Sequence, residues 1–283
     1  MEELTGRVAV VTGAGSGIGR ALAGAFAGEG MHLMLADIDP ARLDHVADEL
    51  RAHGTEVATR VTDVGDGTEI EALAKETLAT LGSVHVVCNN AGIGAGGMVA
   101  GFDTALWKRV IDVDLWSVLH GLRVFLPILI EQGEGHVVNT ASVAGLFAPP
   151  FMGPYDVSKA GVVAISEAAF NELAIFAPNV GISVLCPGWV RTNIAEAQIA
   201  AAQAAADNDG DGENEMTATF GAMIRGYIES GMDPADVAGQ VVDAVRARRF
   251  YILTHPASAD VVRQRMEAIV GGGNPPAIGP DNF

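Results

Sequence analysis

Short runs rich in β-branched residues alternate with longer helical patterns through the first two-thirds of the chain. The strand-like runs are RVAVVT, MHLMLA, EVATRVT, VHVVCN, HVVNTA and GISVLC, and helical patterns follow the first five at about 17–29, 40–53, 66–81, 103–131 and 154–177. Because strand-to-strand crossovers are right-handed, such helices cover both faces of a parallel sheet. A further run, RFYILT at 249–254, follows a helix that has Asp233 as N-cap and Pro234 in its first position. The pattern predicts an α/β fold, a doubly wound parallel sheet of about seven strands with helices on both faces.

The composition fits one large domain, residues 1–283, with a well-buried core, because 49% of the residues are hydrophobic. The formal net charge of −18 argues against a nucleic-acid or anionic-membrane partner. Cys88 and Cys186 lie in apolar runs without ligand-spaced partners, which favours free thiols in a reducing compartment. The start MEELT shows no signal-peptide pattern, and the longest aliphatic run, VFLPILI, is too short to span a bilayer. We therefore expect a cytoplasmic protein without a membrane partner.

The composition changes between residues 191 and 231, where an Ala-rich helical pattern leads into an acidic loop and a second amphipathic helix. This segment predicts a helical lid over the substrate site, inserted within the single domain. Its piece DNDGDG matches the first half of a calcium loop, but Ala218 stands where the loop requires a bidentate Glu, so we expect no metal. Residues 270–283 are expected to form a flexible or oligomer-contacting tail.

A glycine-rich stretch, VVTGAGSGIGRALA, joins the first strand to the first helix and supplies Gly13, Gly17 and Gly19. Glycines there let the backbone approach a pyrophosphate, whose charge meets the free N–H groups at the helix N-terminus. The second strand then ends at Asp37, whose carboxylate can accept both ribose hydroxyls and would repel a 2′-phosphate. No Arg or Lys stands in the glycine-rich turn before Arg20 to offset that repulsion. The pattern predicts a Rossmann-like nucleotide site that prefers NAD to NADP.

Five motifs in order resemble those of the short-chain dehydrogenase/reductase (SDR) family: TGAGSGIG from Thr12, NNAG from Asn89, NTAS from Asn139, YDVSK from Tyr155 and PGWVRT from Pro187. The resemblance covers about residues 5–255. It implies that a set of residues borders the cofactor: Gly13, Ser16, Gly17, Ile18, Gly19, Asp37, Ile38, Asp63, Val64, Asn90, Ala91, Gly92, Tyr155, Lys159, Pro187, Gly188, Val190 and Thr192.

Tyr155 and Lys159 stand four residues apart at the start of a helix, so their side chains share one face. Beside a nicotinamide ring, Tyr155 is a candidate general base for an alcohol proton if its pKa falls from about 10 towards neutrality. The ammonium of Lys159 is expected to favour the phenolate. Ser142, at the end of a strand, is expected to hold the substrate oxygen.

Asp114 marks a departure from the family pattern. The family commonly has an asparagine in the helix before the fifth strand, in a pattern like N-x-x-G-V, which helps to hold a water linked to the lysine. Here VIDVDLWSVLHG has Asp114 at the asparagine position and Ser117 at the glycine position. We expect Asp114 to be a fourth catalytic residue. If it is protonated, it imitates asparagine and keeps the water; if it is ionised, its charge partly offsets the Lys159 ammonium and raises the apparent pKa for alcohol oxidation.

The substrate pocket is expected to include Ala144, Phe147 and Trp189, which suits an apolar or aryl-bearing substrate. The predicted function is NAD-dependent interconversion of a secondary alcohol and a ketone. The alternatives are a non-catalytic NAD-binding regulator and a nucleotide-sugar epimerase or dehydratase, the latter disfavoured by the short C-terminal part. The helices at 103–131 and 154–177 carry apolar residues on more than one side, which predicts a homodimer or homotetramer.

Overall fold

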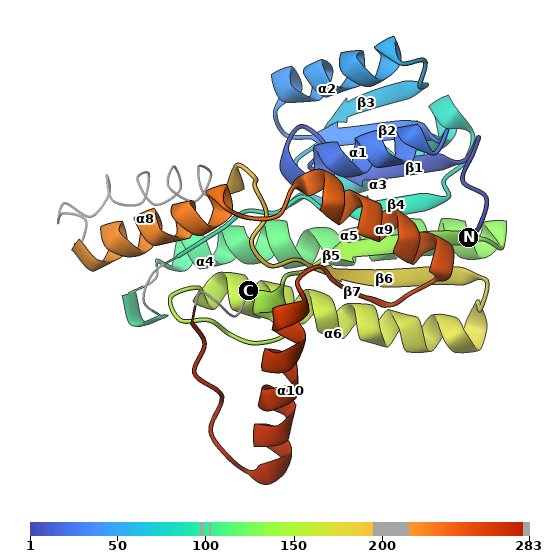
Figure 1. Cartoon of the computed structure of the whole chain (residues 1–283). Helices are drawn as coiled ribbons and strands as arrows, with labels where there is room; N and C mark the ends of the chain where they lie inside the picture. The colour runs from blue at the N-terminus through green and yellow to red at the C-terminus, as the bar shows by residue number, and fades with distance from the viewer. Residues whose placement is uncertain (97–98, 102, 195–214, 280–283) are drawn as a thin grey trace.

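The computed structural model describes the whole chain except residues 97–98, 102, 195–214 and 280–283 (Figure 1). Within the described residues, seven parallel strands form one sheet in the order β3-β2-β1-β4-β5-β6-β7. The strands are β1 (Val8–Thr12), β2 (His32–Asp37), β3 (Val57–Val61), β4 (Val86–Asn89), β5 (Gly135–Thr140), β6 (Val180–Cys186) and β7 (Tyr251–Leu253). The predicted doubly wound parallel sheet is confirmed.

Helices cover both faces of this sheet (Figure 1). On one face α1 (Gly17–Gly28), α2 (Pro40–Ala52) and α9 (Pro234–Ala247) pack around Phe26, and on the other α3 (Gly67–Leu81), α5 (Ser117–Gln132) and α6 (Gly153–Phe176) pack around Phe125. The central strands β1, β4, β5 and β6 are buried along their whole length, as strands between two helical layers must be. This rigid core fixes the strand ends that carry the candidate site.

The helix predicted at 103–131 consists of three joined segments. It runs as α4 (Thr104–Ile111), a π-helical turn η2 (Asp112–Trp116) and then α5, after a short 3₁₀ turn η1 (Val99–Gly101). Residues 104–132 are the one helical stretch in the described part of the chain that is long and apolar enough to cross a membrane, by length and composition only. Here α5 packs against α3, β4 and β5, as a core helix of the fold.

The segment predicted as a substrate lid, residues 191–231, is described only in part. Its second helix, α8 (Glu215–Glu229), agrees with the predicted amphipathic helix, whereas the Ala-rich stretch and most of the acidic loop lie outside the described residues. The two ends of the segment lie side by side, because Val190 forms a parallel bridge with Met232, and Met232 N–H donates to the carbonyl of Trp189. The guanidinium of Arg191 also binds the carbonyl of Gly231 and the carboxylate of Asp233. The base of the lid is thus fastened by backbone and side-chain contacts.

A C-terminal helix, α10 (Pro256–Gly271), follows β7 and extends away from the sheet (Figure 1). This helix was not predicted, because the apolar periodicity of its sequence is weak. Only Ser258 and Val261 among its residues are buried. Val261, together with Ile278 of the following segment, packs against Val143 and Phe147 of the loop after β5. The C-terminal segment therefore touches the loop that carries Ser142.

Candidate active site

A groove opens at the carboxyl ends of the strands, beside β1 and β4, where the order of the sheet reverses. This switch point is where doubly wound sheets bind their ligands. The groove is lined by every predicted cofactor residue except Gly188 and Val190, which line an adjoining pocket instead. The structure thus brings the predicted set together from the ends of five strands and from the start of α6.

The turn after β1 needs glycine at two positions. Gly13 has a left-handed φ of +66°, and a Cβ there would lie 2.8 Å from the Cα of Ala91. A Cβ on Gly19 would lie 2.0 Å from the carbonyl oxygen of Gly13. Ser16 is the N-cap of α1, but its side chain does not cap the helix. The first N–H groups of α1 therefore face the groove without a side-chain acceptor, as a pyrophosphate site requires.

Asp37 is fixed at the far end of the groove. One of its carboxylate oxygens accepts the N–H of Gly15 at 2.8 Å and the other accepts the N–H of Asp39 at 3.0 Å. Arg42, from α2, also lines this part of the groove, which the sequence analysis missed. Its Nε pairs with the Asp39 carboxylate at 3.2 Å, so the local charge of these three side chains is negative.

Asp63 follows β3 and is held by two contacts. Its carboxylate accepts the N–H of Gly65 at 3.0 Å and pairs with the guanidinium of Arg109 at 3.2 Å. Arg109 reaches the groove from α4 and is a second arginine that the sequence analysis missed. Nothing in its sequence surroundings distinguishes it from an exposed helix arginine, because the contact joins residues 46 positions apart.

Buried hydrogen bonds hold the strand ends in place. The Thr12 hydroxyl accepts the N–H groups of Asn90 and Ala91, and Asn90 in turn accepts from the Thr140 hydroxyl. One layer below, Asn89 donates to Asn139, and Asn139 donates to the Ser166 hydroxyl of α6 at 2.9 Å. These chains tie β1, β4 and β5 to one another and α6 to β5, so they fix where α6 presents its side chains.

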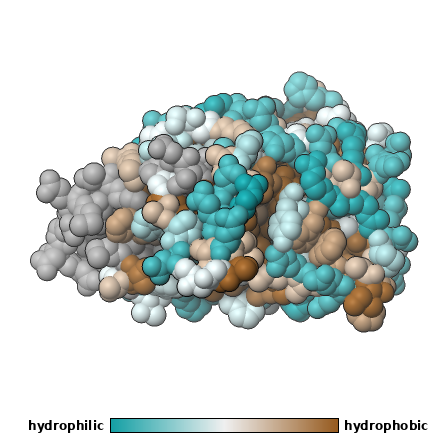
Figure 2. Space-filling view, turned by 60° about the horizontal axis from the view of Figure 1, so that its bottom comes forward, coloured by the Kyte–Doolittle hydropathy of each residue, from teal (hydrophilic) through white to brown (hydrophobic). Residues whose placement is uncertain are grey.

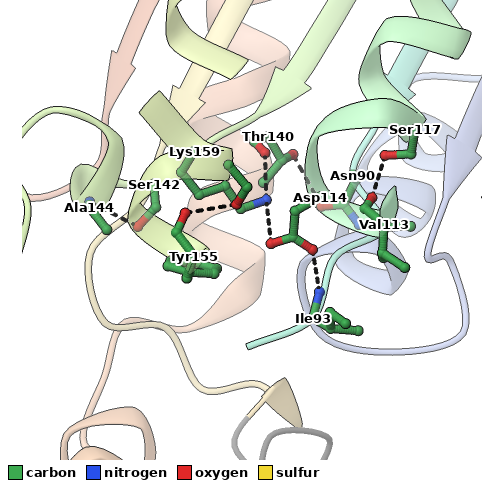
Figure 3. Close-up of polar contacts among 12 residues, drawn as sticks. Asn90, Ile93, Val113, Asp114, Ser117, Thr140, Ser142, Ala144, Tyr155 and Lys159 are labelled. Carbon is green, nitrogen blue, oxygen red and sulfur yellow. Dashed lines mark hydrogen bonds and ion pairs between the residues drawn. The ribbon is translucent and has the colours of Figure 1, made fainter. Parts of the chain in front are cut away.

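Ser142 lies beside Tyr155, in the pocket that adjoins the groove (Figure 3). Ser142 is buried, its hydroxyl oxygen accepts the N–H of Ala144 at 3.1 Å, and it lies 3.4 Å from the carbonyl of Pro187. Ser142 is therefore a helix cap, at the start of the short turn η3 (Val143–Gly145), and at the same time a neighbour of the Tyr155 phenol. The two roles are compatible, because a hydroxyl oxygen can accept while its proton donates, and the present acceptor of that proton, the Pro187 carbonyl, is at the long distance of 3.4 Å.

Lys159 lies buried between Tyr155 and Asp114 (Figure 3). Its Nζ lies 5.5 Å from the centroid of the Tyr155 ring, donates to the carbonyl of Thr140 at 3.2 Å, and is 3.5 Å from Oδ2 of Asp114. Oδ1 of Asp114 accepts the N–H of Ile93 at 2.8 Å. Oδ1 of Asp114 thus has a backbone hydrogen-bond donor, whereas Oδ2 has no hydrogen-bond partner among the described residues and faces the Lys159 ammonium across an ion-pair distance.

Asp114 owes its place to the π-helical turn η2. Within this wider turn, the Ser117 hydroxyl donates a hydrogen bond of 2.5 Å to the carbonyl of Val113. Asp114 is fully buried. Burial raises the pKa of its carboxyl, and the charge of Lys159 opposes this rise only in part. Single π turns are common at functional sites, because they aim side chains that a regular helix would turn away.

The pKa of Tyr155 corrects one expectation. Burial raises the pKa of the phenol above its ordinary value, the charge of Asp114 raises it further, and the contact with Ser142 lowers it. The sequence analysis expected Lys159 to bring this pKa down towards neutrality. Burial is the main cause of the rise and the charge of Asp114 the second, so in the protein chain by itself the pKa of the phenol is raised and not lowered.

Comparisons with known proteins identify the family. A family model described as short chain dehydrogenase matches residues 7–203. The chain belongs to the short-chain dehydrogenase/reductase family. It is 31% identical over 271 residues to the 1-deoxy-11-beta-hydroxypentalenate dehydrogenase of Streptomyces exfoliatus, covering 93% of this chain and 88% of the relative. It is 28% identical over 277 residues to the CLA biosynthesis dehydrogenase/reductase of Lactiplantibacillus plantarum, covering 97% of each.

A solved SDR structure is similar over nearly the whole chain. The short-chain dehydrogenase/reductase of Burkholderia phymatum, crystallised in complex with NAD, has 42% sequence identity and a TM-score of 0.93, and the match covers 99% of both chains. This chain is therefore an SDR oxidoreductase, and its groove fits a dinucleotide on its own evidence: the Gly13 and Gly19 backbone, the uncapped start of α1 and the fixed Asp37 carboxylate.

A second pocket in this SDR adjoins the groove at Tyr155. Apolar side chains dominate its wall, including Ala144, Met152, Trp189, and Ile224 and Ile228 from α8. Trp189 stacks on Tyr227 of α8 with ring centroids 5.6 Å apart. Two of the three residues predicted for the substrate, Ala144 and Trp189, line this pocket. Phe147 does not, because it is buried against Val143 and Val261 under α10, a helix that the sequence analysis did not predict.

Proposed function

We propose that this SDR is an NAD-dependent oxidoreductase that interconverts a secondary alcohol and a ketone, with Tyr155 as general acid and base. One observation carries the proposal. Tyr155 lines both the cofactor groove and the apolar pocket, with Ser142 on one side and Lys159 on the other. A substrate oxygen in the apolar pocket would therefore meet a proton donor at the point where the two cavities join.

When NAD is bound in its oxidised form, its nicotinamide ring would supply a hydride acceptor that carries a positive charge. Ser142 would donate its hydroxyl proton in a hydrogen bond to the substrate oxygen. The hydroxyl oxygen of Ser142 already accepts from Ala144, so the proton is the part of this group that is left to bind the substrate. Tyr155 would give a proton to the oxygen of a ketone or take one from an alcohol. Lys159, fixed by Thr140 and Asp114, would stabilise the phenolate that forms when Tyr155 has given up its proton.

The raised pKa of Tyr155 bears on the direction of the reaction. A phenol that is protonated at neutral pH is ready to act as the acid in ketone reduction, whereas oxidation requires the phenolate. We infer that reduction runs well at neutral pH and that oxidation needs a more alkaline solution. The nearby carboxylate of Asp114 is the feature that separates this SDR from relatives with asparagine at that position.

The substrate is proposed to be uncharged and apolar or aryl-bearing. No Lys or Arg is among the described residues that line the apolar pocket. Arg191, the arginine of the PGWVRT motif, binds Gly231 and Asp233 at the base of the segment predicted as a lid. A substrate carboxylate or phosphate would therefore find no free guanidinium among these residues. Cys88 and Cys186 are buried free thiols, which supports the cytoplasm as the site of action.

NAD is expected to be used at least about tenfold more efficiently than NADP, because a 2′-phosphate would face the fixed carboxylate of Asp37. Asp37→Ser should reduce this ratio, since Arg42 could then pair with the phosphate. The double variant Asp37→Ser, Arg42→Ala is the matched control and should lose the gain. Steady-state kcat/KM for both cofactors measures these effects, and equal values for the unaltered enzyme would refute the preference.

Tyr155→Phe is expected to lower kcat by a factor of about 100 or more, because the ring remains while the proton donor is lost. The dissociation constant of NAD should change by less than about twofold, since the phenylalanine ring still fills the space. Absorbance at 340 nm with a panel of ketones and alcohols gives the rates, and calorimetry gives the affinity. Unaltered turnover in the variant would show that Tyr155 is structural, whereas no turnover of any panel compound by the unaltered protein would favour a non-catalytic NAD-binding role.

A homodimer or homotetramer is expected to form through the apolar surface of α6 and its neighbours. Phe170, Ile175 and Phe176 of α6 are 44%, 72% and 79% exposed, and Trp116 is 49% exposed. Figure 2 shows brown apolar patches that interrupt the hydrophilic surface on the face turned to the viewer. Sedimentation at micromolar concentration should give a mass of twice or four times 29.2 kDa. A 29.2 kDa species alone would contradict this prediction.

A further inference from the structure

The loop between β6 and the lid is held from the C-terminal side of the chain. The N–H of Gly188 donates to Nδ1 of His255 at 3.1 Å and lies 3.4 Å from the hydroxyl oxygen of Thr254. Thr254 is buried directly after β7, and His255 is the N-cap residue of α10. The imidazole makes no capping hydrogen bond to its own helix. Its Nδ1 is turned to the Gly188 loop, 67 residues earlier in the chain.

The hydrogen bonds define the tautomer of His255. Nδ1 accepts from Gly188, so the ring proton of the neutral imidazole lies on Nε2. The Thr254 hydroxyl, 2.7 Å from the same Nδ1, can donate to it as well. Burial lowers the pKa of His255, and a backbone hydrogen bond with Trp189 opposes this. The neutral ring thus serves as an acceptor that fixes one backbone N–H of the loop.

Gly188 lines the apolar pocket, next to the point where this pocket and the cofactor groove share a wall. The preceding Pro187 lines both of them, and its carbonyl accepts the N–H of Val143 at 3.0 Å. The following Trp189 forms part of the apolar wall and stacks on Tyr227. The loop is therefore held at three points. The Ser142 hydroxyl binds the carbonyl of Pro187, and Val190 forms the bridge to Met232. Between these two points, His255 binds the N–H of Gly188.

We propose that His255 is a positioning residue that sets the loop at Gly188 against the nicotinamide end of the cofactor. This inference rests on the proposed function, in which Pro187, Gly188 and Val190 border the nicotinamide. His255 touches neither cofactor nor substrate in this role and acts through the backbone of Gly188. It binds the loop to the end of β7, so that the nicotinamide side of the site depends on the C-terminal segment.

Two substitutions separate the Nδ1 acceptor from the rest of the side chain. In His255→Asn the amide oxygen can take the position of Nδ1, whereas in His255→Gln the longer side chain reaches towards the position of Nε2. His255→Leu removes both positions and serves as a further variant. His45→Gln, at an exposed histidine of α2, is the control for the substitution itself.

Calorimetric titration with NAD and with ADP-ribose, which lacks the nicotinamide, is the test. For His255→Gln and His255→Leu we expect NAD to bind about fivefold to tenfold more weakly, the loss of one hydrogen bond, while ADP-ribose binds within about twofold of the unaltered protein. His255→Asn and His45→Gln should bind both ligands normally. Thermal unfolding of each variant checks that it is folded, and His255→Gln gives the result if His255→Leu does not fold.

Equal weakening for NAD and ADP-ribose would overturn the proposal, because it would show a general structural loss. Normal NAD binding by His255→Gln would overturn it too. If the unaltered protein bound ADP-ribose but not NAD, the proposed function itself would fail, and that outcome is visible before any variant is made.

Discussion

The buried ion pair between Lys159 and Asp114 is the contact on which the candidate site depends. It joins α6 to the π-helical turn η2 at the carboxyl end of β5, where Lys159 also binds the Thr140 carbonyl. Two charges without solvent cost free energy unless each has a partner, and here each has one. Removal of either charge would leave the other buried and unpaired. The pair therefore fixes the lysine beside Tyr155 while it reduces the positive potential that the phenol experiences.

The rest of the site is arranged around this pair by the parallel sheet. The Thr12 and Asn90 hydrogen bonds align the ends of β1 and β4 for the cofactor, and the chain from Asn89 through Asn139 to Ser166 seats α6 on the sheet. The substrate side depends on segments far along the chain, α8 for the apolar wall and His255 for the loop at Gly188. The sheet thus gives the cofactor half a rigid frame, whereas the substrate half is assembled from C-terminal segments.

Features that depend on hydrophobic periodicity and on the residues at strand ends could be predicted from the sequence. Seven strands, the glycine-rich turn and the grouping of Tyr155 with Lys159 all depend on local patterns. The π-helical turn escaped prediction because apolar residues lie on more than one side of 103–131, so a change of phase within the helix leaves no mark in the pattern. Arg109 and His255 were missed because their partners lie 46 and 67 residues away. The opposing charge of Asp114 could be predicted from its place in the motif, whereas the larger cause of the raised pKa of Tyr155, the burial of its phenol, emerges only from the packed structure.

The most direct test is the pH dependence of kcat/KM for alcohol oxidation at saturating NAD, measured for the unaltered enzyme and for Asp114→Asn. The negative charge of Asp114 raises the pKa of Tyr155, so its removal should lower that pKa and make the phenolate available at lower pH. The acidic limb of the profile should then move to lower pH by about one unit, the effect of one charge a few ångströms away at an effective dielectric constant near 20. An unchanged profile would show that Asp114 carries no charge in the working enzyme. A shift to higher pH would place Asp114 outside the proton relay.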